Sequence, residues 1–257
     1  MHPTISALQK VVALGDDRLS AWDIPARVLL APLIGAQAIY VLKRAVVLPE
    51  PAGARCGHVG TGPSLRVLII GDSSAAGVGA ATQGAALAGQ LARALAPHFS
   101  VSWRLEAETG ATTSTTLAKI PRLEPLLYDI AILALGVNDV TRAVTLARWT
   151  RQQVVLHQRL RNRFKTRHIF ASGLPPMGMF PLLPQPLRWV LGQQAKRLDR
   201  ALATLAQADP GLSHIPFDLP QDRRFFASDG YHPNAQAYAL WADILARRII
   251  SKAVLQG

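Results

Sequence analysis

The chain has 257 residues, 49% of them hydrophobic and 17% charged, so its composition excludes a disordered protein and allows one large buried core. Its 28 Lys and Arg against 16 Asp and Glu give a formal net charge of +12, which could attract nucleic acid, anionic lipid or an acidic substrate without choosing among them. The single cysteine, Cys56, excludes an internal disulfide and is compatible with a reducing compartment.

An uncharged segment near the N-terminus, residues 28–42, is bounded by Arg27 on one side and by Lys43 and Arg44 on the other. Its length falls short of the ~20 residues that a membrane-spanning helix needs, and it begins too late to be typical of a cleavable signal peptide. Two interpretations stay open: a helix packed on the globular domain, or an interfacial or short membrane anchor. We therefore expect a cytoplasmic protein whose membrane contact, if it makes one, is peripheral and runs through residues 24–44.

A segment rich in Gly and Pro, residues 49–63, follows and shows little apolar periodicity. It is predicted to be a linker. The sequence thus divides into an N-terminal helical and linker region, residues 1–63, and a main domain, residues 64–257.

The main domain alternates short apolar runs with helical patterns, which predicts a parallel sheet covered by helices on both faces. Residues 130–135 read Ile-Ala-Ile-Leu-Ala-Leu, and a strand that is apolar on both faces belongs in the middle of such a sheet. Strands are predicted at 65–70, 101–105, 130–135, 168–172 and 214–217, and helices at 85–95, 187–205 and 234–251. The predicted fold class is α/β with a mostly parallel five-stranded sheet.

The densest basic run is predicted to close a helix, where cations favour the negative end of the helix dipole. It consists of Arg159, Arg161, Arg163, Lys165 and Arg167. Because the chain has no zinc-ligand spacing and no recognisable nucleic-acid-binding motif, we expect no nucleic-acid partner.

A first group of chemically active residues, Gly71-Asp72-Ser73-Ser74, follows the predicted strand at 65–70. Small residues let the backbone turn sharply and hold Ser73 at the start of a helix, where a developing anion is favoured. Taken alone, this motif also fits an ordinary turn.

A second group, Gly136-Val137-Asn138-Asp139, follows the predicted central strand. The Asn138 amide could donate to an oxyanion without adding charge. The alternative is a turn that merely ends the strand. Asp139 is predicted to cap a helix that starts at Val140.

The third group, residues 229–234, reads Asp-Gly-Tyr-His-Pro-Asn and precedes the last predicted helix. The spacing lets the Asp229 carboxylate fold back onto the His232 imidazole, which fixes the tautomer while the other ring nitrogen faces a nucleophile. The alternative is a capped helix start.

Together these motifs resemble those of the SGNH hydrolase superfamily, also called GDSL esterases. Residues 71–73 match its first block, Gly110 fits the glycine of the second, residues 136–139 match the third and residues 229–233 the fifth. The resemblance covers about residues 64–251. One departure is Ser74, where the first block has Leu.

The resemblance implies a three-layer α/β/α fold of flavodoxin-like topology that cleaves esters without metal or organic cofactor. By the same resemblance, Ser73 is the nucleophile, and His232 and Asp229 complete a triad. The oxyanion hole would consist of the Ser73 and Gly110 N–H groups and the Asn138 amide. The Gly-x-Ser-x-Gly elbow of the α/β-hydrolases is absent around Ser73, which argues against that fold.

The Pro-rich apolar segment 173–184 follows the fourth predicted strand and is predicted to line an acyl site, with plain packing as the alternative. We expect the substrate to be a small-molecule ester of short or medium acyl chain that contacts this segment and also Asp72 and Phe226. The predicted substrate contacts are Asp72, Pro176, Met177, Met179, Phe180 and Phe226.

Other functions remain open on the same residues. A lysophospholipase, thioesterase, carbohydrate deacetylase or acyltransferase would use one and the same acyl-enzyme. A non-catalytic nucleic-acid- or lipid-binding protein is less favoured, because such a protein usually loses some of the catalytic motif residues and this chain keeps all of them.

The histidines have no metal-ligand spacing, so no metal is expected. The sequence does not determine the oligomeric state.

Overall fold

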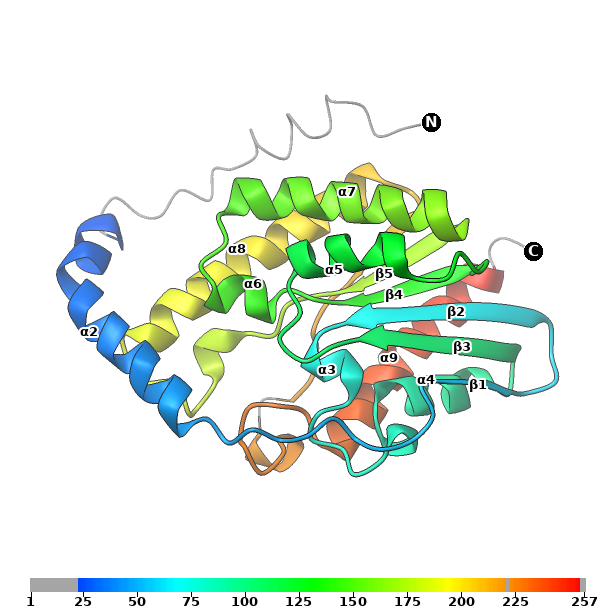
Figure 1. Ribbon diagram of the computed structural model, residues 1–257, viewed down its shortest axis with the longest axis horizontal. Coiled ribbons are helices and arrows are strands. Elements are labelled where there is room, and N and C mark those ends of the chain that lie inside the picture. Colours follow the sequence, from blue (N-terminus) through cyan, green and yellow to red (C-terminus); the bar gives the residue numbers. More distant parts are fainter. Residues whose placement is uncertain (1–22, 221, 255–257) are drawn as a thin grey trace.

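A six-stranded sheet forms the centre of the protein in the computed structural model, which describes residues 23–220 and 222–254 (Figure 1). The strand order is β1-β3-β2-β4-β5-β6, and only β1 runs antiparallel to its neighbour. The five parallel strands have the flavodoxin-like order that the sequence resemblance implied. The strands are β1 (Cys56–Val59), β2 (Ser64–Gly71), β3 (Ser100–Ala107), β4 (Ile130–Ala134), β5 (His168–Ser172) and β6 (Leu212–Ile215).

Helices cover both faces of the sheet, so the predicted three-layer α/β/α architecture is confirmed (Figure 1). One face carries α5, α7 and α8, and the other carries α4 and α9. The helices are α2 (Asp23–Arg44), α3 (Ser73–Ala76), α4 (Leu87–Leu95), α5 (Thr113–Lys119), α6 (Val137–Thr141), α7 (Leu146–Phe164), α8 (Leu187–Ala208) and α9 (Ala235–Val254). Short 3₁₀ turns are η1 (Gln83–Ala85), η2 (Ile120–Arg122), η3 (Met177–Met179) and η4 (Arg223–Phe225).

The central strand β4 explains why the sheet is covered on both sides. All five of its residues are buried, and they alternate between two hydrophobic clusters. Ala131 and Leu133 face the cluster that contains the α7 and α8 side chains, whereas Ile130 and Ile132 face the cluster of α4 and α9. Side chains of successive strand residues point to opposite faces, so this apolar run needs a helical layer on each side.

The predicted number of five strands is corrected by β1, which adds an edge strand from within the predicted linker. In register, Cys56 pairs with Arg104 and Val59 with Val101. No residue of β1 is fully buried, so the strand needs no apolar pattern of its own, and this is why periodicity did not reveal it. The division of the chain at residue 63 stays a prediction.

The basic run is confirmed at a helix end. Arg159, Arg161 and Arg163 lie in the last part of α7, and Lys165 ends the helix in the left-handed conformation at φ +55°.

The N-terminal uncharged segment belongs to a longer helix than its 15 residues indicated. Helix α2 has 22 residues because it continues through Asp23 at one end and Arg44 at the other. By length and composition alone it could cross a membrane, and none of its residues is fully buried. It contacts the start of α8, beyond the carboxyl ends of the strands (Figure 1).

Candidate active site

The first functional loop places Ser73 where strand β2 ends and α3 begins. The Asp72 carboxylate accepts hydrogen bonds from the Ser74 N–H at 3.0 Å and the Ser74 hydroxyl at 2.7 Å, which caps α3. Ser74, the departure from the family motif, thus strengthens the turn that presents Ser73. Gly71 is required here, because an added Cβ would lie 2.5 Å from the Ala134 carbonyl oxygen on the neighbouring strand.

The loop before α9 brings Asp229 and His232 to Ser73. The His232 Nδ1 lies 2.5 Å from Asp229 Oδ2, and His232 Nε2 lies 2.8 Å from the Ser73 hydroxyl. Residues 73 and 232, which are 159 positions apart in the chain, therefore meet at the same edge of the sheet. Gly230 makes the turn possible at φ +63°, and an added Cβ there would lie 2.6 Å from Leu182.

Hydrogen bonds hold the Asp229 carboxylate in its charged form. Burial by itself would raise the pKa of Asp229, but the hydrogen bond to His232 and the N–H groups of Tyr231 and His232 outweigh it, so the pKa lies below the ordinary value. A carboxylate that stays ionised can keep the Nδ1 proton in place and stabilise a positively charged imidazole.

The loops that carry Gly110 and Asn138 are joined to each other. The Asn138 amide donates to the Ala111 carbonyl oxygen at 3.0 Å, and the Arg142 guanidinium donates to the Gly110 carbonyl oxygen at 3.2 Å. An amide nitrogen has two hydrogens, so this bond leaves one N–H of Asn138 for a ligand. Gly110 itself adopts φ +81°.

The prediction that Asp139 caps a helix is wrong. Helix α6 begins at Val137, and Asp139 is fully buried inside it. Its carboxylate accepts the Thr113 N–H and the Thr113 hydroxyl, each at 3.0 Å. Burial raises the pKa of Asp139 despite these hydrogen bonds. Asp139 therefore fastens the loop of Asn138 to the loop of Gly110.

A contact that sequence reasoning missed comes from the predicted linker. The Glu50 carboxylate accepts the Thr109 N–H and the Thr109 hydroxyl, each at 2.8 Å, and pairs with Arg55 at 2.8 Å. Burial would raise the pKa of Glu50, but the bonds from Thr109 and Arg55 lower it below the ordinary value. Residue 109 adjoins Gly110, so Glu50 anchors the loop that carries Gly110. No motif marks Glu50 in the sequence.

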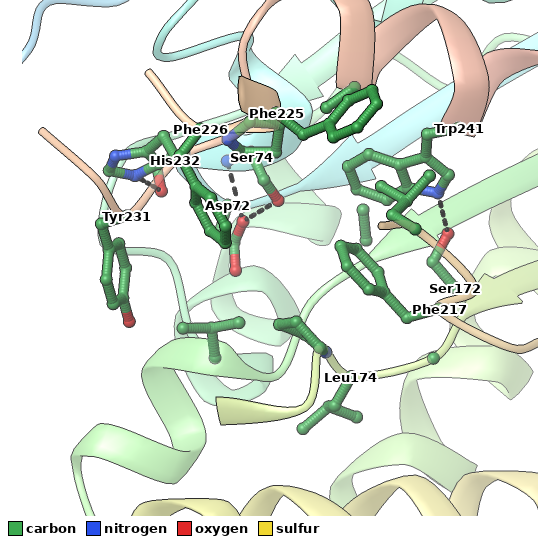
Figure 2. Close-up of a pocket in the computed structure, with 18 of the residues that line it drawn as sticks. Asp72, Ser74, Ser172, Leu174, Phe217, Phe225, Phe226, Tyr231, His232 and Trp241 are labelled. Carbon is green, nitrogen blue, oxygen red and sulfur yellow. Dashed lines mark hydrogen bonds between the residues drawn. The ribbon is translucent and has the colours of Figure 1, made fainter. Parts of the chain in front are cut away.

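A largely apolar pocket opens beside the Ser73 hydroxyl, and Figure 2 shows Trp241 and Phe217 on one side of it and Tyr231 and His232 on the other. Of the predicted substrate contacts, Asp72, Phe180 and Phe226 line this pocket, as does Asn138. The remaining ones do not line it. Those are Pro176, Met177, which is fully buried in the core, and Met179, which is 60% exposed.

The far wall of the pocket was not predicted. The Trp241 indole N–H donates to the Ser172 hydroxyl at 3.1 Å, and the Phe217 ring lies edge to face on Trp241 at 5.6 Å between centroids. Trp241 is buried on α9, and no pattern in the sequence indicates that this side of the helix also borders a pocket. Phe217 lies beyond β6, not within it as predicted.

A second Asp-His pair lies away from Ser73. The His214 Nε2 lies 2.8 Å from Asp199, which also accepts the Leu174 N–H at 2.9 Å. This pair supports the loop after β5, one wall of the pocket. Within residues 23–220 and 222–254, no group of three or more His, Cys, Asp or Glu side chains could hold a metal ion.

Comparison with known proteins bears on this geometry. The profile of the GDSL-like lipase/acylhydrolase family matches residues 69–240. A GDSL-like esterase of Mycobacterium tuberculosis is 30% identical over 191 residues, which is 70% of this chain and 60% of that protein. The chain therefore spans less than two thirds of that relative's length.

Solved structures share the fold. A family 3 carbohydrate esterase of Clostridium thermocellum has a TM-score of 0.60 at 18% identity, covering 76% of this chain and 100% of that one. A psychrotrophic esterase of a Pseudoalteromonas species has a TM-score of 0.57 at 18% identity, with the same coverage of 76% and 100%. At this level of identity the similarity concerns the fold alone.

Proposed function

Because the chain belongs to the GDSL-like lipase/acylhydrolase family, we propose that it is a carboxylic ester hydrolase with Ser73, His232 and Asp229 as its catalytic triad. The observation that carries the proposal is the continuous line of hydrogen bonds, 2.8 Å from the Ser73 hydroxyl to His232 and 2.5 Å from His232 to Asp229. These are the distances and the order that nucleophile, base and orienting carboxylate require.

In the proposed reaction, His232 Nε2 takes the proton from the Ser73 hydroxyl as its oxygen attacks the acyl carbonyl carbon. Asp229 holds the Nδ1 proton and stabilises the resulting imidazolium. The tetrahedral oxyanion accepts hydrogen bonds from the backbone N–H groups of Ser73 and Gly110 and from the free N–H of Asn138.

His232 then returns the proton to the leaving alkoxide, and the C–O bond of the ester breaks to leave an acyl group on Ser73. A water molecule, deprotonated by the same imidazole, attacks this acyl-enzyme. The acid departs, and the Ser73 hydroxyl regains its proton.

The pocket favours an aliphatic acyl chain of medium length over an acetyl group or a sugar. Its walls carry aromatic and aliphatic side chains and few polar groups. Apolar walls stabilise a chain by removing its methylene groups from water, at about 0.8 kcal/mol for each. The pocket lining that supports this proposal includes Leu135, Leu174, Phe180, Phe217, Leu219, Phe225 and Trp241.

A lysophospholipase, a thioesterase and an acyltransferase use the same acyl-enzyme and differ in the leaving group or in the acceptor. A carbohydrate deacetylase would instead need polar groups around the leaving sugar. Among these, the apolar pocket supports the first three more than the last.

The test compares the parent with Ser73→Ala on p-nitrophenyl esters from two to twelve carbons. We expect the parent to hydrolyse them with kcat/KM highest at medium length, and Ser73→Ala to show no turnover above background. Ser251→Ala, at an exposed serine of α9 outside the pocket, is the matched control and should retain the activity. Equal rates of the parent and Ser73→Ala would refute the proposed nucleophile. A maximum at the acetyl ester would refute the proposed acyl preference.

A further inference from the structure

Helix α2 has its polar side chains turned toward the protein and its apolar side chains turned outward. The half-buried positions recur every three or four residues and so form one stripe along the helix. They are Asp23, Ala26, Arg27, Leu30, Ile34, Gln37, Ala38 and Val41. Every polar or charged residue between positions 23 and 39 lies in this stripe.

Specific contacts hold that stripe against the start of α8. The Gln37 amide donates to the Gln185 carbonyl oxygen at 2.6 Å and accepts the Leu187 N–H at 3.0 Å. The Arg27 guanidinium lies 5.4 Å from the centre of the Trp189 ring. Gln37 and Arg27 of the inner face therefore contact residues at or just before the start of α8.

The outward face is apolar and exposed. Leu29 is 81% exposed and Leu42 is 77% exposed, and residues 28–42 carry no charge. The other large apolar side chains of this face are Ile24, Val28, Leu33, Ile39 and Tyr40. A water-facing helix normally shows the reverse pattern, and a contiguous apolar surface of this kind marks an interaction site.

The outward face lies at the same end of the molecule as the proposed catalytic residues. Helix α2 lies beyond the carboxyl ends of the strands (Figure 1), and it rests on the chain that leads into α8. Gly173, Leu174, Pro175 and Phe180 of that chain line the pocket. Met179 and Leu182, in the segment that precedes α8, are also exposed.

We infer that the outward face of α2 docks on an anionic phospholipid bilayer, with the helix axis in the membrane plane. Lys43 and Arg44 are exposed at one end of this face, where they can pair with lipid phosphates, and Arg44 lies over the Tyr40 ring at 5.3 Å. Tyr and cationic side chains are the residues that favour the boundary between headgroups and acyl chains. The formal net charge of +12 favours an anionic surface over a second copy of the same chain.

An in-plane orientation fits α2 better than a spanning one. If α2 crossed the bilayer, Gln37 and Arg27 would lose their partners on α8 and enter lipid, which is costly for polar and charged groups. Lying flat, the helix keeps those contacts and inserts only its apolar face. If the proposed function holds, docking also presents the pocket to esters of the membrane surface.

The test is co-sedimentation of the full chain with vesicles of phosphatidylglycerol and phosphatidylcholine, compared with vesicles of phosphatidylcholine alone. We expect the parent to sediment with the anionic vesicles and at least ten-fold more weakly with the neutral ones. The variant Leu29→Glu/Leu42→Glu should bind anionic vesicles at least ten-fold more weakly than the parent. The matched control, Leu126→Glu/Leu127→Glu, changes two exposed leucines before β4 and should bind like the parent.

Equal binding by the Leu29→Glu/Leu42→Glu variant and the parent would overturn the inference. So would a parent that stays in the supernatant, including one that forms dimers through α2. Resistance of bound protein to extraction at alkaline pH would contradict the in-plane orientation. The Ser73→Ala variant should sediment like the parent, so that failure of the proposed esterase function and failure of docking are separate results.

Discussion

The two halves of the proposed active site are held in different ways. The relay arm, Ser73, His232 and Asp229, has two of its members three residues apart in one turn, and one hydrogen bond joins this turn to Ser73. The oxyanion arm, Gly110 and Asn138, comes from two separate segments, the loop before α5 and the helix α6. Contacts of Asp139 with Thr113 and of Glu50 with Thr109 fasten those segments.

The difference shows where information about a site resides. Local sequence suffices to build the relay arm, because an Asp and a His with a Gly between them can form their contact within one turn. The oxyanion arm depends on partners that are distant in the chain. Substitutions in the relay arm should therefore act directly on the reaction, whereas the oxyanion arm should also respond to residues outside the site.

The largest effect is expected from Asp229→Asn in the relay arm. An amide in place of the carboxylate no longer holds the Nδ1 proton of His232, so we expect kcat to fall about 10⁴-fold. Steady-state kinetics on a p-nitrophenyl ester measures this, with Asp243→Asn, at a half-exposed aspartate on α9, as the control. A loss of less than ten-fold would mean that Asp229 does not orient the base.

Asn138→Ala tests the oxyanion arm itself. Loss of one donor to the tetrahedral oxyanion should lower kcat by about 10²–10³-fold while KM changes little, because the donor acts mainly in the transition state. Asn162→Ala on the exposed side of α7 is the control. If KM rose and kcat stayed constant, Asn138 would bind the substrate and not the oxyanion.

Asp72 lies beside Ser73 of the relay arm, and its substitution should affect stability. Burial raises the pKa of Asp72 to about 6 from 3.8, although the Ser74 hydrogen bonds oppose the shift. The native state then binds the proton more tightly than the unfolded state, so this contribution to stability is complete below pH 3.8 and is lost as pH rises through about 6.

Asp72→Asn should therefore raise the free energy of unfolding at pH 7 by up to about 3 kcal/mol relative to the parent, with a smaller gain near pH 4. Urea unfolding of both proteins at the two pH values measures the difference. Asp222→Asn, at an exposed aspartate, should show no such gain at neutral pH. A gain independent of pH would rule out a buried ionised carboxylate at Asp72.

The smallest effect is expected from Glu50→Ala, which tests whether the oxyanion arm responds to a residue outside the site. Losing the bonds to Thr109 should loosen the Gly110 loop and cost on the order of 1 kcal/mol, or about five-fold in kcat, with KM unchanged. Glu50→Gln keeps an acceptor and should recover part of the loss, and Glu124→Ala is the control. Unchanged kcat in Glu50→Ala would show that the loop holds without this contact.

The same contrast explains what the sequence could predict. Strands β4 and β5 are short runs of buried residues, and their apolar composition indicated them directly. Asp229 and His232 were found from their spacing. By contrast, β1 is exposed and forms only by pairing with β3, so local pattern carries no signal for it.

The lining of the pocket could be predicted from the sequence only in part. Met177 and Met179 lie in an apolar loop that follows a strand, but one turn directs the first into the core and the second into solvent. Phe217 and Trp241 reach the pocket from two other elements, and only the fold brings them together. Composition predicts that a loop is apolar, whereas the direction of each side chain depends on tertiary contacts.

The nucleophilic role of Ser73 is tested most directly by labelling with a fluorophosphonate probe and locating the adduct by peptide mass spectrometry. We expect one adduct on Ser73 in the parent, none in Ser73→Ala and a much slower reaction in His232→Ala. An adduct on another serine, or equal labelling of the parent and Ser73→Ala, would contradict the proposed triad.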